Sequence, residues 1–233
     1  MNILALLVYL LVTSATVTLF YRVAARRSRP IYGKGDQRLE SKSLFRLAVK
    51  ISAPIGALLS LIQSFAITGL DLLGLSTVAL TTAVAFLLVV FAYTDHRYRK
   101  ADRTLLHWAI GLALVLGIPR LIEMQSEPAA VLFVFGALIS FSLMFVPGLG
   151  PSDARAFVLI VTAGIPTLGL VPTYQVLISG VGIWLIYGIV ASIRARSTKA
   201  SIPLVPYILL PFVVVSLWLS LSYGVPQIIN MLS

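Results

Sequence analysis

Two aspartates are the residues of this sequence whose side chains and positions are best suited to acid–base chemistry. Asp95 follows the apolar run 72–93, and Asp153 precedes the apolar run 156–171. Ionisable side chains at the edge of a membrane span are costly unless they are paired or functional. If the fold brings the two carboxylates together, they share a proton, because two adjacent anions repel each other. One carboxylate then activates a water molecule and the other protonates a carbonyl group, which is the chemistry of peptide hydrolysis.

The residues before Asp153 favour a functional interpretation of that aspartate. Gly148 and Gly150 allow close backbone approach or unusual dihedral angles, and Pro147 and Pro151 interrupt a helix. The alternative is that both aspartates simply mark loop ends beside arginines, because ion pairs at such interfaces are ordinary.

The other acidic residues are weaker candidates. Asp102 is a rival to Asp95, although it lies further past the apolar run. The rest are expected in the basic segments or between spans on the outer side: Asp36, Glu40, Asp71, Glu123 and Glu127.

The two histidines of the chain, His96 and His107, do not predict a metal site. Histidines beside an aspartate can bind zinc. However, His107 lies in an apolar run beside Trp108, where a hydrogen-bonded contact between helices is the favoured interpretation. His96 either tunes its neighbour Asp95 or is solvated. We therefore expect no metal and no other cofactor.

The composition is that of a membrane protein. Of the 233 residues, 59% are hydrophobic and 11% are charged, whereas soluble domains have roughly 25% charged residues. The absence of cysteine excludes disulfides and thiolate chemistry. The net charge of +10 lies in short segments between apolar runs. We interpret it as contact with anionic membrane lipid and not as nucleic-acid binding.

Eight apolar runs predict the architecture. Each is close to the roughly 17–25 residues that cross a bilayer as a helix. The sequence therefore predicts an all-α, polytopic bundle of about eight transmembrane helices, as one membrane domain over residues 1–233. Glycines in the seventh run, among them Gly180 and Gly182, permit close helix packing. The runs are 3–21, 51–70, 72–93, 104–122, 129–147, 156–171, 173–193 and 204–222.

The basic residues predict the orientation. If both termini lie outside, the segments 22–50, 94–103, 148–155 and 194–203 face the cytoplasm and hold all but one of the 18 Lys and Arg residues. This distribution obeys the positive-inside rule. It predicts a multi-pass protein of the cell's inner (plasma) membrane with both aspartates at the cytoplasmic face. Segment 22–50 is expected to be a basic cytoplasmic loop before a core over residues 51–230. No Lys or Arg precedes the first run, so it is expected to remain as an anchor.

The segment from Gly148 to Arg155, G-L-G-P-S-D-A-R, resembles the G-M-G-x-G-D-x-K signature of type IV prepilin peptidases. These enzymes belong to the GxGD class of intramembrane aspartyl proteases. The family has its other catalytic aspartate at the cytoplasmic end of an earlier span, where Asp95 stands. A late I-P-F-G-P-[FY] element of the family is similar to I-P-L-V-P-Y at residues 202–207. The three elements occur in the family's order.

This resemblance implies an aspartic-type endopeptidase with Asp95 and Asp153 as its catalytic pair. The implied partner is a prepilin-like protein substrate with a short basic leader and an apolar helix. That places the protein in type IV pilus assembly or protein secretion. The residues of the motifs that would support the pair are Gly148, Gly150, Ser152, Arg155, Pro203 and Pro206.

Several positions depart from the family pattern. Ser152 replaces the glycine before the second aspartate, Arg155 replaces a lysine, and Val205 replaces the glycine of the late element. The I-P that follows the family's first aspartate is absent. Bifunctional members also methylate the pilin and often carry two cysteine pairs in a longer first loop. Segment 22–50 has no cysteine, so we expect a divergent peptidase without the methyltransferase loop.

The alternative is a non-catalytic membrane protein. It would be an inactive relative that acts in pilus or secretion assembly, or a small transporter subunit, because aspartates at the membrane boundary can also bind cations or relay protons. A transporter is expected to have charged or polar groups near the bilayer midplane, and the apolar runs offer only His107. The particular substrate and the oligomeric state stay open.

Overall fold

The computed structural model describes residues 2–28, 37–66, 71–98, 103–123, 151–195 and 204–232, with a few single positions between 133 and 142. The secondary structure of this part of the chain is entirely α-helical, as predicted. The expected span 129–147 lies outside the described residues apart from those single positions. The helices are α1 (Ile3–Ser28), α2 (Gln37–Ala66), α3 (Leu72–Tyr98), α4 (Arg103–Glu123), α6 (Pro151–Leu168), α7 (Leu170–Ala195) and α8 (Val205–Leu232).

The described helices are those of a multi-pass membrane protein. Four segments are long and apolar enough to cross a membrane: Ile3–Arg26, Lys42–Ser64, Leu72–His96 and Leu170–Arg194. Two shorter apolar helical segments, Thr104–Ile118 and Val205–Ser216, accompany them. Each of these segments overlaps a predicted apolar run. Helices suit this setting because they satisfy all their backbone hydrogen bonds internally, where lipid offers no partner.

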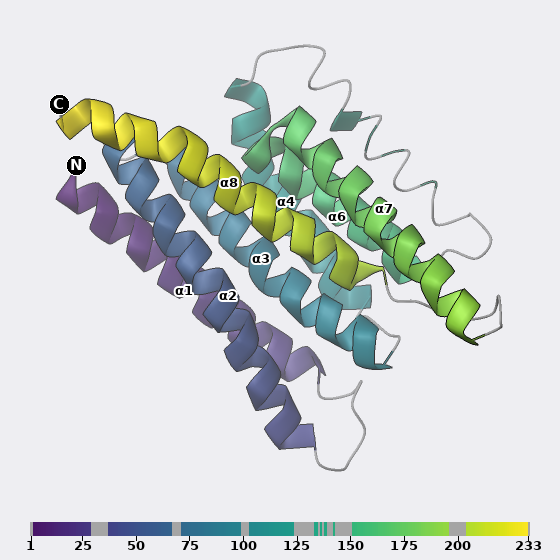
Figure 1. Ribbon diagram of the computed structural model, residues 1–233. Helices are drawn as coiled ribbons and strands as arrows, with labels where there is room; N and C mark the ends of the chain where they lie inside the picture. Colours follow the sequence, from purple (N-terminus) through teal and green to yellow (C-terminus); the bar gives the residue numbers. More distant parts are fainter. Residues whose placement is uncertain are drawn as a thin grey trace.

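Helix α3 lies at the centre of the bundle. It contacts α1, α2, α4, α6 and α8, and every residue from 80 to 92 is buried. Figure 1 shows α3 behind α8 and between α2 and α6. A helix that is apolar all round belongs at such a position. Asp95 follows directly after this buried stretch.

Small and hydroxyl-bearing residues bring α1, α2 and α3 together. The Thr13 and Ser60 hydroxyl oxygens lie 3.2 Å apart, and the Ser60 hydroxyl also donates to the Gly56 carbonyl oxygen at 2.7 Å. A Cβ on Gly56 would come within 2.5 Å of the Thr82 hydroxyl oxygen and 2.6 Å of the Thr13 methyl group. This is the close packing that small residues allow between helices in lipid.

The basic segment 22–50 differs from the predicted loop. Residues 22–28 continue α1, and residues 37–50 form the first turns of α2. Leu44, Phe45 and Ala48 are buried, and the Phe45 ring meets the Tyr21 ring edge-on with centroids 5.4 Å apart. Spacings of three and four residues place an apolar stripe on one helix face. The segment is therefore largely two helix ends that pack together, with Arg46 and Lys50 exposed.

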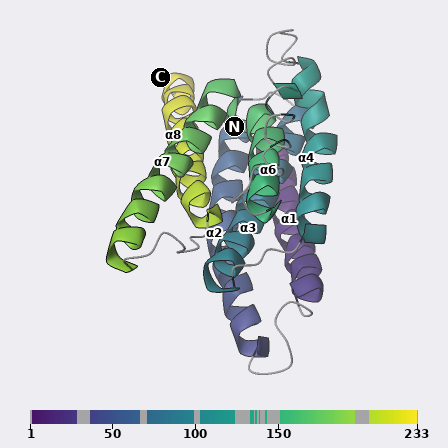
Figure 2. The ribbon, with the colours of Figure 1, turned by 90° about the vertical axis from the view of Figure 1, so that its right-hand side faces the viewer.

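Helices α6 and α7 are separated by a single residue, Gly169, whose φ is 90°. Its N–H donates to the Ile165 carbonyl oxygen at 3.1 Å, and its own carbonyl oxygen accepts from the Thr173 N–H at 3.2 Å. Only glycine adopts this left-handed conformation without a steric cost. Figure 2 shows the two helices running in opposite directions, with the end of α7 standing apart from the other helices.

Replacing Gly169 by Ala is expected to destabilise the protein by about 1–2 kcal/mol, the cost of a left-handed conformation in a residue with a Cβ. Thermal unfolding of the purified protein in detergent measures this. The control is Gly182→Ala, because a Cβ there meets nothing within 4 Å. Equal unfolding temperatures for the two variants would contradict the strained turn.

Candidate functional site

The Asp95 carboxylate joins the end of α3 to the beginning of α8. Its side chain is buried, with 8% of its surface exposed. Its Oδ2 accepts a hydrogen bond of 3.2 Å from the backbone N–H of Val205, the first residue of α8. The first N–H groups of a helix have no acceptor within the helix, and a carboxylate is well suited to that position. Asp95 therefore holds the start of α8 in a buried site.

This contact brings together two elements that the sequence analysis singled out. Val205 lies in the segment 202–207 and is 110 residues from Asp95 along the chain. Pro206 is the second residue of α8 and is partly buried. Proline is tolerated there because its missing N–H would have had no helical acceptor. Pro203 lies outside the described residues.

Asp153 occupies the first turn of α6 and is partly buried. A negative charge at this position interacts favourably with the partial positive charge of the helix N-terminus. Helix α6 packs against both α3 and α8. The fold therefore places Asp153 on a helix that contacts the two elements joined through Asp95.

Arg155 connects the beginning of α6 to the beginning of α4. Its Nε–H donates a hydrogen bond of 3.0 Å to Nε2 of His107. The predicted contact of His107 with another helix is confirmed, although the sequence did not identify Arg155 as the partner. Because a guanidinium group only donates, Nε2 of His107 is the acceptor in this bond.

The bond between Arg155 and His107 also defines the end of the bundle at which Asp153 lies. His107 is in the second turn of α4, which begins a few residues after α3 ends. Asp153, two residues before Arg155, is therefore at the same end of the bundle as Asp95. That this end faces the cytoplasm, as the charge pattern indicates, stays a prediction.

The other predicted site residues are described only in part. Ser152 lies in the first turn of α6, whereas Gly148, Gly150 and the rival aspartate Asp102 lie outside the described residues. His96, beside Asp95, is exposed. In the part of the chain that the structure describes, no three His, Asp or Glu side chains are grouped so that they could hold a metal ion.

Removal of the Asp95 carboxylate is expected to reduce stability, because the Val205 N–H would remain buried without this acceptor. Asp95→Ala should lower the free energy of unfolding by about 1–3 kcal/mol, the usual cost of such an unsatisfied group. Asp95→Asn keeps a carbonyl oxygen and should unfold close to the native temperature. Thermal unfolding in detergent compares the three proteins. Equal stability of the Ala and Asn variants would contradict the role of this hydrogen bond.

The described arrangement offers a buried carboxylate, a second carboxylate at the same end of the bundle, and an Arg–His pair beside it. Carboxylates and histidine are side chains that can donate and accept protons. Comparison with protein-family models, curated proteins and solved structures finds no match to this chain.

Proposed function

We propose that this protein is a membrane-embedded aspartyl endopeptidase that removes the leader of prepilin-like substrates at the cytoplasmic boundary of the membrane. The observation that carries the proposal is the hydrogen bond from the Val205 N–H to the buried Asp95 carboxylate. This hydrogen bond joins the residue at the position of the family's first catalytic aspartate to the segment 202–207, which is similar to the family's late I-P-F-G-P-[FY] element. Residues so far apart in the sequence have no local reason to meet.

In this proposal Asp95 and Asp153 hold a water molecule between them. One carboxylate takes a proton from the water as it attacks the scissile carbonyl carbon, and the protonated carboxyl gives its proton to the carbonyl oxygen. When the C–N bond breaks, the first carboxyl passes the proton it took from water to the leaving amine, and the second regains its proton from a hydroxyl of the tetrahedral intermediate. The Val205 N–H fixes the orientation of the Asp95 carboxylate, and orientation of reacting groups is a large part of catalysis. The reaction uses no metal or organic cofactor.

The proposed membrane topology has eight spans. The described helices supply seven, and the apolar run 129–147 supplies the other. With both termini outside the inner membrane, the end of the bundle that holds Asp95 and Arg155 faces the cytoplasm, in agreement with the positive-inside rule. The substrate's apolar helix lies in the bilayer, so its cleavage site arrives at the depth of the two aspartates.

Cleavage of a co-expressed prepilin-like substrate tests the proposal. The native chain should convert the precursor to a form that is shorter by its leader, and sequencing of the new N-terminus should place the cut at the boundary between the basic leader and the apolar helix. The same substrate expressed without the chain is the control. A native chain that is folded in the membrane but cleaves no prepilin-like substrate would contradict the proposal.

A non-catalytic relative that acts in pilus or secretion assembly is the second candidate. The observation that favours it is that Asp95 already has a structural task, because its carboxylate binds the first N–H of α8. In that case the aspartate is retained to hold two helices together and Asp153 to stabilise the start of α6. Co-purification of an uncleaved prepilin-like protein with the native chain would support this candidate.

A further inference from the structure

An open pocket lies along one face of α4. Its volume is about 550 Å³, within the range of roughly 300–1,000 Å³ that is usual for small-molecule sites. A Cβ on Gly111 would meet nothing within 4 Å, so there is open space beside this residue. The described residues that line it are spaced three and four apart on the helix: Thr104, His107, Trp108, Gly111, Leu112 and Val115.

The polar and apolar parts of this pocket are separated along α4. Thr104 and His107 lie at the end where α4 begins, and His107 there binds the guanidinium group of Arg155. Beyond them the lining is apolar as far as Val115. At a rise of about 1.5 Å per residue, Thr104 to Val115 spans about 16 Å. This length equals about half of the roughly 30 Å hydrocarbon core of a bilayer.

We propose that this pocket binds one anionic phospholipid. Its phosphate lies beside Arg155 and His107, and one acyl chain runs along Gly111 and Val115 into the membrane. The charge is complementary, because Arg155 supplies a cation at the polar end. Basic pockets between helices at the cytoplasmic side are typical sites for anionic headgroups. Trp108 has the position expected of an interfacial aromatic residue, and its side chain is 68% exposed.

The dimensions favour a lipid over a transmembrane helix of a partner protein. Such a helix is about 10–12 Å wide with its side chains and crosses both leaflets. The described lining of the pocket is only about half as long as the bilayer core is thick, and its cation lies at one end. This inference does not depend on the proposed peptidase activity, since Arg155 and the pocket would bind lipid in an inactive relative as well.

Native mass spectrometry of the full chain tests the site. The protein is purified in detergent and mixed with equal amounts of phosphatidylglycerol and phosphatidylcholine, and the ratio of the two bound lipids is measured. The native chain should retain mainly phosphatidylglycerol. Arg155→Gln should lower that preference about fivefold, because one basic residue near an anionic lipid contributes about 1 kcal/mol. Arg194→Gln, which removes an exposed charge on α7, should leave the ratio unchanged.

Gly111→Leu distinguishes binding in this pocket from a general attraction of anionic lipid to the positively charged protein. The added side chain enters the open space and should lower the retention of both lipids without a loss of stability, because Gly is a poor helix former. Equal effects of Arg155→Gln and Arg194→Gln would overturn the proposal, as would full lipid retention by Gly111→Leu. A dimer that Gly111→Leu abolishes while lipid retention persists would overturn it in favour of a second copy of the chain.

Discussion

Replacing Asp153 by Asn is expected to lower the rate of leader cleavage by about 10²–10⁴-fold, the usual contribution of an acid or base in the transition state. The amide keeps the size of the side chain but can no longer accept or donate the proton that the reaction moves. Asp153 lies in the first turn of α6, where loss of the negative charge removes only about 0.3–1 kcal/mol of favourable interaction with the helix N-terminus. The amount of folded protein should therefore stay close to that of the native chain.

Asp95→Asn is expected to reduce cleavage to the same degree, because the pair acts as a unit and loses its function with either member. The measurement is the rate at which purified protein in lipid processes a prepilin-like precursor. Unfolding temperatures of the same preparations establish that each variant is folded. Loss of cleavage in both variants with unchanged unfolding temperature assigns the two aspartates to the chemistry.

Asp71→Asn provides a matched control at the opposite end of α3. The Asp71 carboxylate accepts hydrogen bonds from the N–H groups of Leu73 and Gly74 at 3.1 and 3.3 Å, so it stabilises the start of that helix. Asn serves equally well at such a position, and cleavage should continue at the native rate.

If Asp95→Asn cleaves normally while Asp102→Asn does not, the assignment of the first aspartate is wrong.

Gly180→Leu is expected to give the largest loss of stability among the glycine variants. A Cβ at this position would lie 3.1 Å from the Tyr207 carbonyl oxygen and 3.1 Å from the Ile208 Cα. Both are backbone atoms of α8, which cannot turn aside as a side chain can. Overpacking typically costs about 1–3 kcal/mol, and the full Leu side chain at a backbone contact should reach the upper part of that range.

Gly182→Leu is the matched control, two residues further along α7. Nothing lies within 4 Å of a Cβ at that residue. Leu should therefore be neutral or stabilise the helix by up to about 1 kcal/mol, because Gly is a poor helix former. Thermal unfolding in detergent compares the two variants. A similar loss of stability in both would contradict the close contact of α7 with α8.

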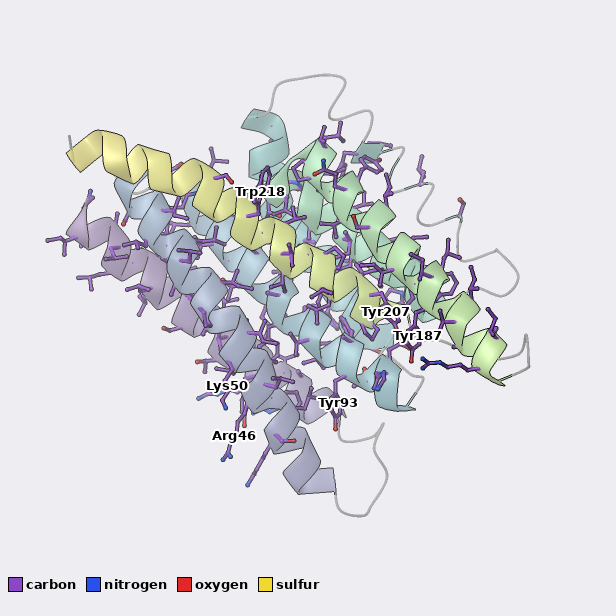
Figure 3. All side chains as sticks on the ribbon, in the orientation of Figure 1. Arg46, Lys50, Tyr93, Tyr187, Tyr207 and Trp218 are labelled. Carbon is purple, nitrogen blue, oxygen red and sulfur yellow. The ribbon has the colours of Figure 1, made fainter. Side chains whose placement is uncertain are left out.

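The contact at Gly180 also affects the candidate site. Tyr207 follows Val205, whose N–H binds Asp95, by two residues, and its ring meets the Tyr187 ring of α7 with centroids 5.3 Å apart. Figure 3 shows Tyr187 and Tyr207 side by side between the two helices. A displacement of α8 by Gly180→Leu should therefore lower cleavage in addition to stability, whereas Gly182→Leu should leave cleavage unchanged.

The sequence by itself determined the helical class and much of the helix placement. Long apolar runs in lipid have to satisfy their backbone groups internally. The runs at residues 72–93 and 173–193 therefore form the helices α3 and α7 whatever their neighbours are. The basic residues likewise predicted that Asp95 and Asp153 would share one end of the bundle. Segment 22–50 was the exception, because its charges obscured the apolar stripe at Leu44, Phe45 and Ala48.

The tertiary structure alone decided which residues meet. Gly180 and Gly182 look alike in the sequence, yet only Gly180 contacts the backbone of α8. Asp95 accepts a hydrogen bond from the Val205 N–H, and His107 accepts one from Arg155. No local sequence pattern predicts either pair. The physical reason is that lipid is as apolar as the helix surfaces. Hydrophobicity therefore makes a helix span the membrane but does not favour one neighbouring helix over another. Close packing and hydrogen bonds determine which helices contact each other.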